Sequence, residues 1–455
     1  MVTIMPLGGG DEIGASCYLL KVGKTGILLD AGLRPRPQNN MPTFARMFEI
    51  VEDWLSINSV LISHPHLDHV GALPKIFERN PEVNIYVPEK SVDLIKIQIL
   101  ESLTKKKKDE KYTEDYPGLE YSIDLVTKCV QKLKPVAPYS PVKIPRTNVS
   151  FEFWDAGHIL GSASIYINTS KLRLLYTGDI STHNRVSIPN LKYKDFNVDV
   201  LLMESTYLAT SNEASPSAGF SDLYKKIKAI TSTCGNVLIP CFALGKAQDI
   251  AKMFVDQNMK EKTPIPLFLD GLVKKVTQVY ERVLGKENYK VIGQGKCNLM
   301  PKGTREAADL KQFLVNHPGC VILASSGMLY KNSASARWAE LLLEDAKSAV
   351  FFTGFLDEES PGARLANARK GDDIEINDSR ITIKAAVDKF YISTHAPPSG
   401  LISIIGRTKP KKIILVHGNN TAQLFHMFKQ RAESELGYQL NILQGANFDK
   451  IECDN

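Results

Sequence analysis

The feature that most constrains this chain is a cluster of three histidines and one aspartate in residues 64–69, His-Pro-His-Leu-Asp-His. Histidine occurs only nine times in the 455 residues, so this concentration is improbable by chance. The cluster directly follows a short apolar run typical of a strand, and a loop at a strand end can direct several side chains to one point. Imidazole and carboxylate are zinc ligands where no thiolate is offered. We expect His64 and His66 to face one metal ion. Asp68 and His69 would then face a second.

Composition indicates an ordinary globular protein that is large enough for two domains, or for one domain with an insertion. The chain has 43% hydrophobic and 23% charged residues. It lacks an apolar run near the roughly 20 residues of a membrane span and a recognisable secretory signal, so we expect a cytoplasmic protein with no membrane partner. Seven scattered cysteines, none in a Cys-x-x-Cys pair, favour neither disulfides nor a cysteine zinc site. The net charge of +6 is compatible with a polyanionic substrate but does not establish one.

The order of strand-like and helix-like segments predicts an α/β fold with an insertion. Short β-branched runs dominate the first part of the chain, and lysine-rich helical segments follow between about residues 91 and 140. From about residue 210, short apolar strands alternate with amphipathic helical stretches, which favours a separate parallel α/β unit. After about residue 380 a pattern of short strands resumes, at 381–385, 389–392 and 413–416. We therefore predict one domain from residues 1–208 and 381–455, with 209–380 inserted into it.

The segment 64–69 matches the His-x-His-x-Asp-His signature of the metallo-β-lactamase superfamily, and two further motifs follow in the order found there. His158 lies in Asp-Ala-Gly-His and Asp179 in Tyr-Thr-Gly-Asp, each directly after a predicted strand. The next plausible histidine ligand, His417, lies beyond the inserted unit, and this arrangement resembles the β-CASP subfamily of nucleic-acid hydrolases. The resemblance implies a metallo-β-lactamase αββα sandwich with an inserted α/β β-CASP cap domain.

The resemblance also implies two zinc ions per chain. It assigns His64, His66 and His158 to the first ion, Asp68, His69 and His417 to the second, and Asp179 to a bridging position. Two divalent cations about 3.5–4 Å apart can polarise a phosphate and activate a water molecule for in-line attack. Asp68 is therefore counted among the catalytic residues as well as among the metal ligands.

Two further motifs of the subfamily place an acidic residue at Glu204 and a histidine at His395. We expect His395 to act as a general acid or phosphate clamp and Glu204 to orient it, because a neighbouring carboxylate keeps the charged form of histidine available. Asp30, at a strand end, is expected either to fix a ligand histidine or to form a turn. Ser325 and Ser326, after a parallel strand, are expected either to bind a substrate phosphate or simply to form a turn.

The motifs at 239–243 and 324–328 look like those of RNase J and of the endonuclease subunit of the pre-mRNA cleavage and polyadenylation factor. Family members that act on DNA typically carry valine where this chain has His417. We therefore predict a ribonuclease that cuts single-stranded RNA in RNA processing or decay, as an endonuclease, a 5′-exonuclease or both.

Two alternatives are a DNA-processing nuclease of the same fold and a non-catalytic scaffold subunit of an RNA-processing complex. The presence of all seven proposed ligands argues against the scaffold. Departures from the subfamily pattern at Lys246, Pro397 and Asn419 replace no proposed metal ligand. A homo-oligomer and membership of an RNA-processing complex both stay open.

Overall fold

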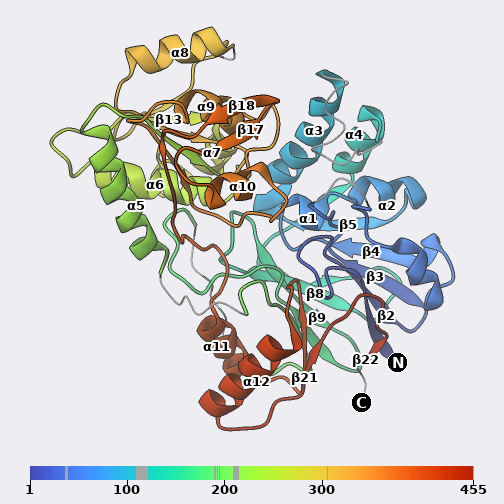
Figure 1. The fold of residues 1–455 in the computed structure, drawn as a ribbon. Helices are drawn as coiled ribbons and strands as arrows, with labels where there is room; N and C mark the ends of the chain where they lie inside the picture. Colours follow the sequence, from blue (N-terminus) through green and yellow to red (C-terminus); the bar gives the residue numbers. More distant parts are fainter. Residues whose placement is uncertain are drawn as a thin grey trace. The chain divides into compact units, whose positions relative to one another are not determined.

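The structure is a computed structural model, and it divides the chain into two compact units (Figure 1). It describes residues 1–35, 39–108, 121–188, 191, 193, 195–208, 215–304 and 306–453. The first unit, called the sandwich below, comprises Met1–Asn184, Pro189–Glu213 and His395–Asn455. The second unit, called the cap below, comprises Arg185–Ile188 and Ala214–Thr394.

The sandwich contains two seven-stranded sheets, each built from the N-terminal and C-terminal parts of the chain. The first sheet has the order β22 (Ile451–Glu452), β1 (Val2–Gly8), β2 (Cys17–Val22), β3 (Thr25–Leu29), β4 (Ile57–Leu61), β5 (Asn84–Pro88), β6 (Leu133–Val136). The second has the order β21 (Ile442–Gln444), β20 (Lys412–Val416), β11 (Val200–Glu204), β10 (Arg173–Tyr176), β9 (Ala163–Asn168), β8 (Ser150–Asp155), β7 (Val142–Lys143).

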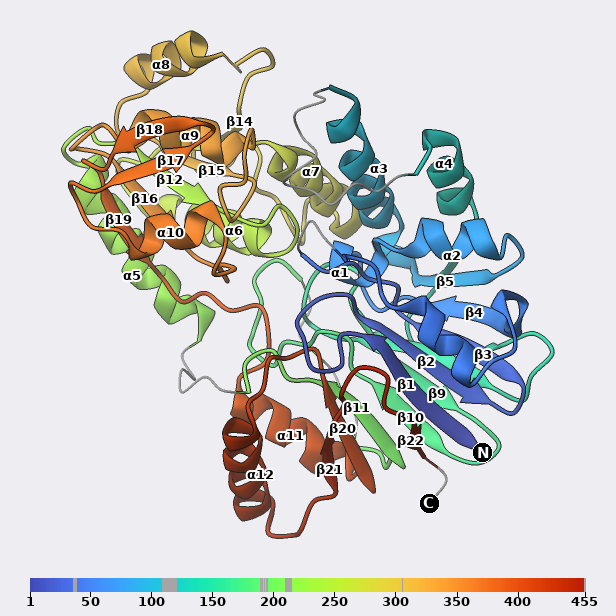
Figure 2. The same cartoon turned by 45° about the vertical axis from the view of Figure 1, so that its right-hand side comes forward.

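Three buried apolar layers place helices outside both sheets. Leu20 of β2 and Ile165 of β9 belong to the layer between the sheets, whereas the adjacent Leu19 belongs to the outer layer of the first sheet, because successive strand residues point to opposite faces. That outer layer packs on α1 (Leu67–Val70), α2 (Leu73–Arg79), α3 (Val92–Lys108) and α4 (Ile123–Gln131). The outer layer of the second sheet packs on α11 (Pro398–Thr408) and α12 (Ala422–Leu436), which lie beside β20 and β21 in Figures 1 and 2. The predicted αββα sandwich is confirmed.

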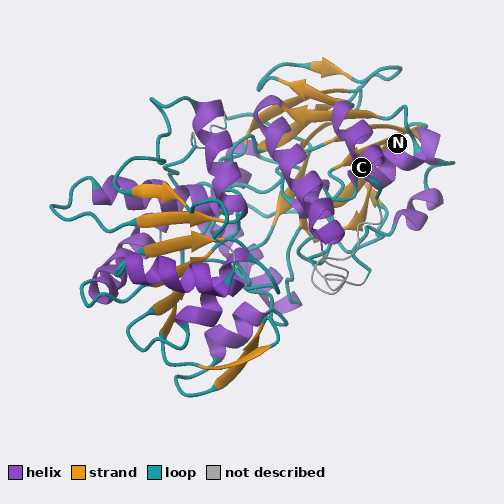
Figure 3. Ribbon diagram, turned by 90° about the horizontal axis from the view of Figure 1, so that it is seen from above, coloured by secondary structure: helices purple, strands orange, loops and turns teal. Residues whose placement is uncertain are grey.

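The cap is built on a six-stranded parallel sheet, seen between its helices in Figure 3. Its order is β14 (Cys297–Leu299), β13 (Leu267–Asp270), β15 (Val321–Ala324), β12 (Val237–Pro240), β16 (Ala349–Phe352), β19 (Ala386–Lys389). The helices of the cap are α5 (Pro216–Thr231), α6 (Lys246–Asn258), α7 (Leu272–Leu284), α8 (Ala307–Asn316), α9 (Ala334–Leu342) and α10 (Pro361–Asn367). The parallel α/β unit predicted from alternating strands and helices is therefore present.

The prediction that short strands of the first domain resume at 381–385 and 389–392 was wrong. The chain instead forms a hairpin of β17 (Asp373–Ile376) and β18 (Ser379–Thr382), and then β19, which pairs with β16 of the cap. Short β-branched runs look alike in either sheet, so local pattern alone cannot assign the partner strand. Residues 381–394 accordingly lie with the cap, whereas the predicted insertion ended at residue 380.

The segment after β3 packs against α1 without room for a side chain at Gly32. Its neighbours Ala31 and Leu33 donate backbone hydrogen bonds to the carbonyl oxygens of His69 and Leu67, at 2.8 and 3.0 Å. A Cβ atom added at Gly32 would lie 1.6 Å from the backbone oxygen of Asp68. The glycine therefore sets how closely α1, with its predicted ligands, approaches the first sheet.

We expect Gly32→Ala to lower the free energy of unfolding by about 3 kcal/mol or more, because the added methyl group can be accommodated only if backbone moves. Urea denaturation of the purified proteins would measure this change. Gly406→Ala in α11 is the matched control, since its added Cβ meets only the end of the Leu436 side chain. A Gly32→Ala protein as stable as the control would contradict this account of the packing.

Among the described residues, no helix combines the length and the apolar character needed to cross a membrane.

Candidate metal centre

Parallel pairing in the second sheet brings three predicted residues to one edge. Strand β11 pairs in parallel with β10 on one side and with β20 on the other. In this register Glu204 lies opposite Val416. The carboxyl ends of parallel neighbours lie at the same edge of a sheet. Asp179 follows β10, Glu204 ends β11 and His417 follows β20 directly. Side chains from distant parts of the sequence therefore meet at this edge.

The other predicted ligands reach the same place from two loops and one short helix. His64 and His66 lie between β4 and α1, and Asp68 and His69 lie on α1 itself. His158 lies in the loop between β8 and β9. All seven predicted ligands thus belong to the sandwich, and their side chains form groups whose potential ligand atoms lie within 4.8 Å of one another.

One group consists of His64, His66, His158 and Asp179. The Nδ1 atom of His66 lies 3.1 Å from Nε2 of His64 and 3.3 Å from Nε2 of His158. The Oδ2 atom of Asp179 lies 3.5 Å from Nε2 of His64 and 3.8 Å from Nε2 of His158. Three ring nitrogens and one carboxylate oxygen therefore converge on one small volume, which is the donor set that zinc accepts.

A second group consists of Asp68, His69 and His417. The Oδ2 atom of Asp68 lies 3.4 Å from Nε2 of His417 and 3.8 Å from Nε2 of His69. Asp179 lies between the groups, because its Oδ2 is 3.5 Å from Nε2 of His69 and its Oδ1 is 3.4 Å from Nδ1 of His417. The side chain of Asp68 is 29% exposed while both histidines are buried, so the site is open to solvent on the side of Asp68.

These side chains fit a divalent metal. The Oδ1 atom of Asp179 is buried and accepts no hydrogen bond from the described part of the chain. An ionised carboxylate oxygen is costly to bury without a compensating donor or cation. His64, His69 and His158 are also buried around this carboxylate. A cation held between these groups would compensate the carboxylate and accept the ring lone pairs.

Hydrogen bonds on the outer side of the site hold two of the ligand rings in the tautomer that a metal needs. Asp30 is fully buried, and its Oδ2 lies 2.7 Å from Nδ1 of His69. Because an ionised carboxylate only accepts, Nδ1 carries the proton and Nε2 presents its lone pair. Ser63 Oγ donates to Oδ2 of Asp30 at 2.6 Å and lies 3.0 Å from Nδ1 of His64, which can therefore donate to it. Tyr176 donates a further hydrogen bond to Asp30 at 2.6 Å.

His417 is held in the same way by Thr206, which the sequence did not single out. Thr206 Oγ1 donates to Oε2 of Glu204 at 2.5 Å and lies 3.0 Å from Nδ1 of His417. The hydroxyl oxygen can therefore accept a hydrogen bond from Nδ1–H of His417. Nε2 of the ring then carries no proton and faces Asp68. Thr206 carries no metal-ligating group, so only its position two residues after Glu204 could have drawn attention to it.

The electrostatics of the site divide its residues between neutral and charged forms. Burial and the nearby charge of His69 lower the pKa of His64 well below its usual value, which favours a neutral imidazole. For His69, burial opposes protonation, but the carboxylates of Asp179 and Asp68 raise its pKa well above the usual value. Burial opposes ionisation of Asp68, yet His69 and His417 lower the pKa of Asp68 to about 2. The carboxylates are thus ionised at neutral pH, as metal ligands must be.

His395 and Glu204 form a pair next to the ligand groups. Nδ1 of His395 lies 2.9 Å from Oε2 of Glu204 and 3.2 Å from Oε1, and Ile180 donates its backbone N–H to Oε1 at 2.6 Å. The ring centroids of His395 and His158 lie 4.5 Å apart. Glu204 is buried, whereas the His395 side chain is 16% exposed. The pair therefore places an imidazole with its Nδ1 anchored and its ring partly open to solvent.

Ser325 and Ser326 belong to the cap, and both hydroxyls accept hydrogen bonds from backbone N–H groups. Ser325 Oγ accepts the backbone N–H of Leu272 at 2.9 Å, and Ser326 Oγ accepts that of Tyr330 at 3.1 Å. These contacts are typical of turn and helix-start serines. A role in binding phosphate stays a prediction.

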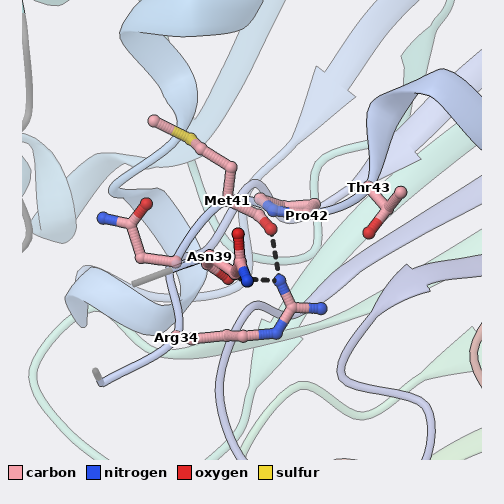
Figure 4. A pocket seen from close by; sticks show the side chains of 6 residues that line it. Arg34, Asn39, Met41, Pro42 and Thr43 are labelled. Atoms are coloured by element: carbon pink, nitrogen blue, oxygen red, sulfur yellow. Dashed lines mark hydrogen bonds between the residues drawn. The ribbon is translucent and has the colours of Figure 1, made fainter. Parts of the chain in front are cut away.

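A pocket of about 660 Å³ lies along the loop after β3 (Figure 4). It is lined by Arg34, Asn39, Asn40, Met41, Pro42 and Thr43. The Arg34 guanidinium donates to the backbone oxygens of Asn39 and Met41, drawn as dashes in Figure 4, and pairs with Glu12 at 2.7 Å. Because these acceptors engage its donors, Arg34 fixes the shape of the loop. None of the predicted metal ligands lines this pocket.

Three segments of the chain match known protein families. Residues 10–200 match the metallo-beta-lactamase superfamily, residues 247–365 the Beta-Casp domain, and residues 380–443 the Zn-dependent metallo-hydrolase RNA specificity domain. Together with the αββα sandwich and its His/Asp groups, these matches place the chain in the metallo-β-lactamase superfamily and define a divalent-metal site. The Beta-Casp match falls within the cap, so the chain belongs to the β-CASP family of that superfamily.

Individual relatives span nearly the whole chain. It is 29% identical to the RNase J-like protein of Methanocaldococcus jannaschii, over 93% of this chain and 94% of that protein. It is 27% identical to Integrator complex subunit 11 of Danio rerio (98% and 73%), and 25% identical to cleavage and polyadenylation specificity factor subunit 3-II of Arabidopsis thaliana (96% and 70%). A protein of unknown function from Enterococcus faecalis V583 has a similar fold, with a TM-score of 0.58, 16% identity and 99% of both chains covered.

We expect Asp30→Asn to weaken zinc binding about 10–100-fold, because loss of the charged acceptor releases the His69 ring from its required orientation. Competition with a chromophoric zinc chelator would measure the affinity. Asp155→Asn, at the end of β8, is the matched control, since Asp155 accepts only an exposed hydrogen bond from Tyr139 in the described structure. Equal zinc affinity in the two variants would show that Asp30 does not position a ligand.

Proposed function

We propose that this protein is a ribonuclease that hydrolyses phosphodiester bonds of single-stranded RNA with two zinc ions per chain. The observation that carries the proposal is the position of Asp179 in a chain with a β-CASP domain: its Oδ2 lies 3.5 Å from Nε2 of His64 in one ligand group and 3.5 Å from Nε2 of His69 in the other. Separate ligand groups that share one carboxylate are suited to a pair of neighbouring cations.

In this proposal His64, His66 and His158 would hold one ion, Asp68, His69 and His417 would hold the other, and both groups would share the carboxylate of Asp179. When bound, such a pair supplies charge that polarises a phosphate and lowers the pKa of a bound water molecule. The residues of the chain keep the ligand nitrogens unprotonated: Asp30 and Thr206 accept hydrogen bonds from the Nδ1–H groups of His69 and His417, so the proton of each ring stays on Nδ1.

His395 is proposed to contact the scissile phosphate. Glu204 holds its Nδ1 proton, so Nε2 is the atom that can donate to a phosphate oxygen or to the departing oxygen. Glu204 is itself fixed by Thr206 and by the backbone N–H of Ile180. The carboxylate therefore holds the imidazole of His395 in one orientation.

Two findings support RNA as the substrate. Residues 380–443, which contain His395 and His417, match a domain described as an RNA specificity domain. Relatives over most of the chain carry the names RNase J-like protein and RNase aCSPSF2. Other relatives are named as subunits of complexes, so association with RNA-processing partners or with a second copy is part of the proposal. The proposed location is the cytoplasm.

Cleavage of matched RNA and DNA strands tests this function. We expect the zinc-loaded protein to cut single-stranded RNA, and we expect Asp179→Ala, which removes the shared carboxylate, to lower kcat at least about 10³-fold. A zinc chelator should abolish cleavage, and added zinc should restore it. Strands labelled at the 5′ or 3′ end, with a monophosphate or triphosphate 5′ end, would report polarity and end preference. Cleavage of DNA alone would favour the DNA-processing alternative, and zinc binding without cleavage would favour the scaffold.

We expect His395→Gln to lower kcat about 10²-fold or more while the zinc content stays at the parent level, because the residue acts on the phosphate and not on the metal. Steady-state kinetics and atomic absorption on the same preparations would separate these effects. His426→Gln, on the exposed side of α12, is the matched control. A parallel loss of zinc and activity would instead make His395 a ligand.

A further inference from the structure

The cap contains a buried lysine, Lys246, whose ammonium is not paired with a carboxylate of the described residues. Lys246 begins α6 and is only 7% exposed, yet its ammonium forms no ion pair with the described residues and donates to the backbone oxygen of Thr353 at 3.1 Å. The nearby carboxylate of Asp249 is already engaged by Arg185, at 2.6 Å from Nε, and by the hydroxyl of Ser187. The ammonium therefore lacks an anionic partner in the part of the chain that the structure describes.

The charges around Lys246 leave a positive excess at this point of the cap. Lys389 ends β19 opposite Phe352 of β16, and its charge, like that of Arg185, acts on Lys246. Burial, together with these two cations, lowers the pKa of Lys246 to about 8. A buried ammonium is costly unless an opposite charge compensates it. An anion bound here would supply that compensation.

An unsatisfied hydroxyl lies beside the ammonium. Thr353 is 1% exposed, and its Oγ1 forms no hydrogen bond of ordinary geometry with the described residues. The neighbouring Cys241 thiol, which interacts with both Lys246 and Thr353, is a weak hydrogen-bonding group. A buried hydroxyl normally finds a strong hydrogen-bonding partner, so a hydroxyl whose neighbour is a weakly bonding thiol is informative. The hydroxyl is a donor suited to an oxyanion.

The ammonium is covered by backbone at Gly354 instead of by a side chain. A Cβ atom added at Gly354 would lie 3.2 Å from Nζ of Lys246 and 3.7 Å from the ring of Phe242. Phe355 follows this glycine in the sequence and the ring of Phe242 lies beside it in space, and the two aromatic residues are 42% and 38% exposed. The loops that contain them follow β12 and β16, at the carboxyl ends of neighbouring parallel strands, where ligands of open α/β sheets bind.

We propose that the cap binds a phosphate group at the start of α6, with the Lys246 ammonium and the Thr353 hydroxyl as donors and Phe242 as a surface for an attached base. The start of a 13-residue helix adds its positive end to the site. The carrier of the phosphate is a nucleotide of single-stranded nucleic acid, because aromatic rings beside a cation bind successive bases and phosphates. This site depends on the proposed function in one respect, which is that RNA is the nucleic acid that carries the phosphate.

Binding and kinetics of four variants test the site. Fluorescence anisotropy of a labelled RNA 12-mer would be measured in the His158→Ala background so that the RNA stays intact, and cleavage would be measured in the zinc-loaded parent background. We expect Lys246→Met to weaken RNA binding about 10-fold and to raise KM by a similar factor, with kcat within about 2-fold. Gly354→Ala should reproduce the loss, because its methyl group crowds Nζ. Lys246→Arg should retain binding, and Lys252→Met, on the same helix but ion-paired with Asp256, is the matched control.

The outcomes distinguish the site from the proposed function. Calorimetry with inorganic phosphate would show whether phosphate alone binds in a way that requires Lys246. Phosphate binding that requires Lys246, with RNA binding unaffected, would make a free phosphate compound the ligand and overturn RNA as the carrier. If the protein cleaves RNA and Lys246→Met changes neither KM nor phosphate binding, the site is overturned while the nuclease stands. If RNA is not cleaved but phosphate binding still requires Lys246, the site stands and the proposed function fails.

Discussion

The parallel pairing of β10, β11 and β20 is the constraint on which the rest of the site depends. It fixes where three strand ends lie, and so it brings Asp179, Glu204 and His417 to one edge although most of the cap, Ala214–Thr394, lies between β11 and β20 in the sequence. Strand register is set by buried side chains such as Leu202 and Ile414 in the layer between the sheets. The apolar core between the sheets therefore positions these three side chains, although its own residues do not belong to the site.

A second level of order comes from groups that contact the ligands and not the substrate. Asp30 accepts hydrogen bonds from Ser63, His69 and Tyr176, which come from three different segments of the sandwich. One buried carboxylate thus connects β3, β10, the loop after β4 and α1. Its burial would be unfavourable without these donors, and with them it fixes the direction of an imidazole lone pair. Stability and ligand geometry depend on the same hydrogen bonds here.

Sequence reasoning reached the fold and the seven residues whose side chains converge in the sandwich because their signals are local. Dense histidines after a strand, a Gly-His turn and a Gly-Asp turn can be seen without knowing which strands pair. It missed Thr206 because a hydroxyl acquires its role only from where Glu204 and His417 come together. It misassigned the strands near 381 and 389 for a related reason, since the choice of β16 as partner of β19 is a long-range property. Lys246 was noticed only as a departure from a family pattern, and its burial next to Thr353 could not be seen from sequence.

The insertion of the cap between β11 and β20 also sets the order in which a growing chain can complete its site. His64, His66, His158 and Asp179 all precede the cap, so one ligand group is present once the first two hundred or so residues have been synthesised. The other group waits for His417, and the first sheet waits for β22 to pair with β1 at the far end of the chain. A nascent chain therefore has six of the seven proposed ligands long before it has His417. The proposed centre can therefore be complete only after the C-terminal part of the chain has been added to the sandwich.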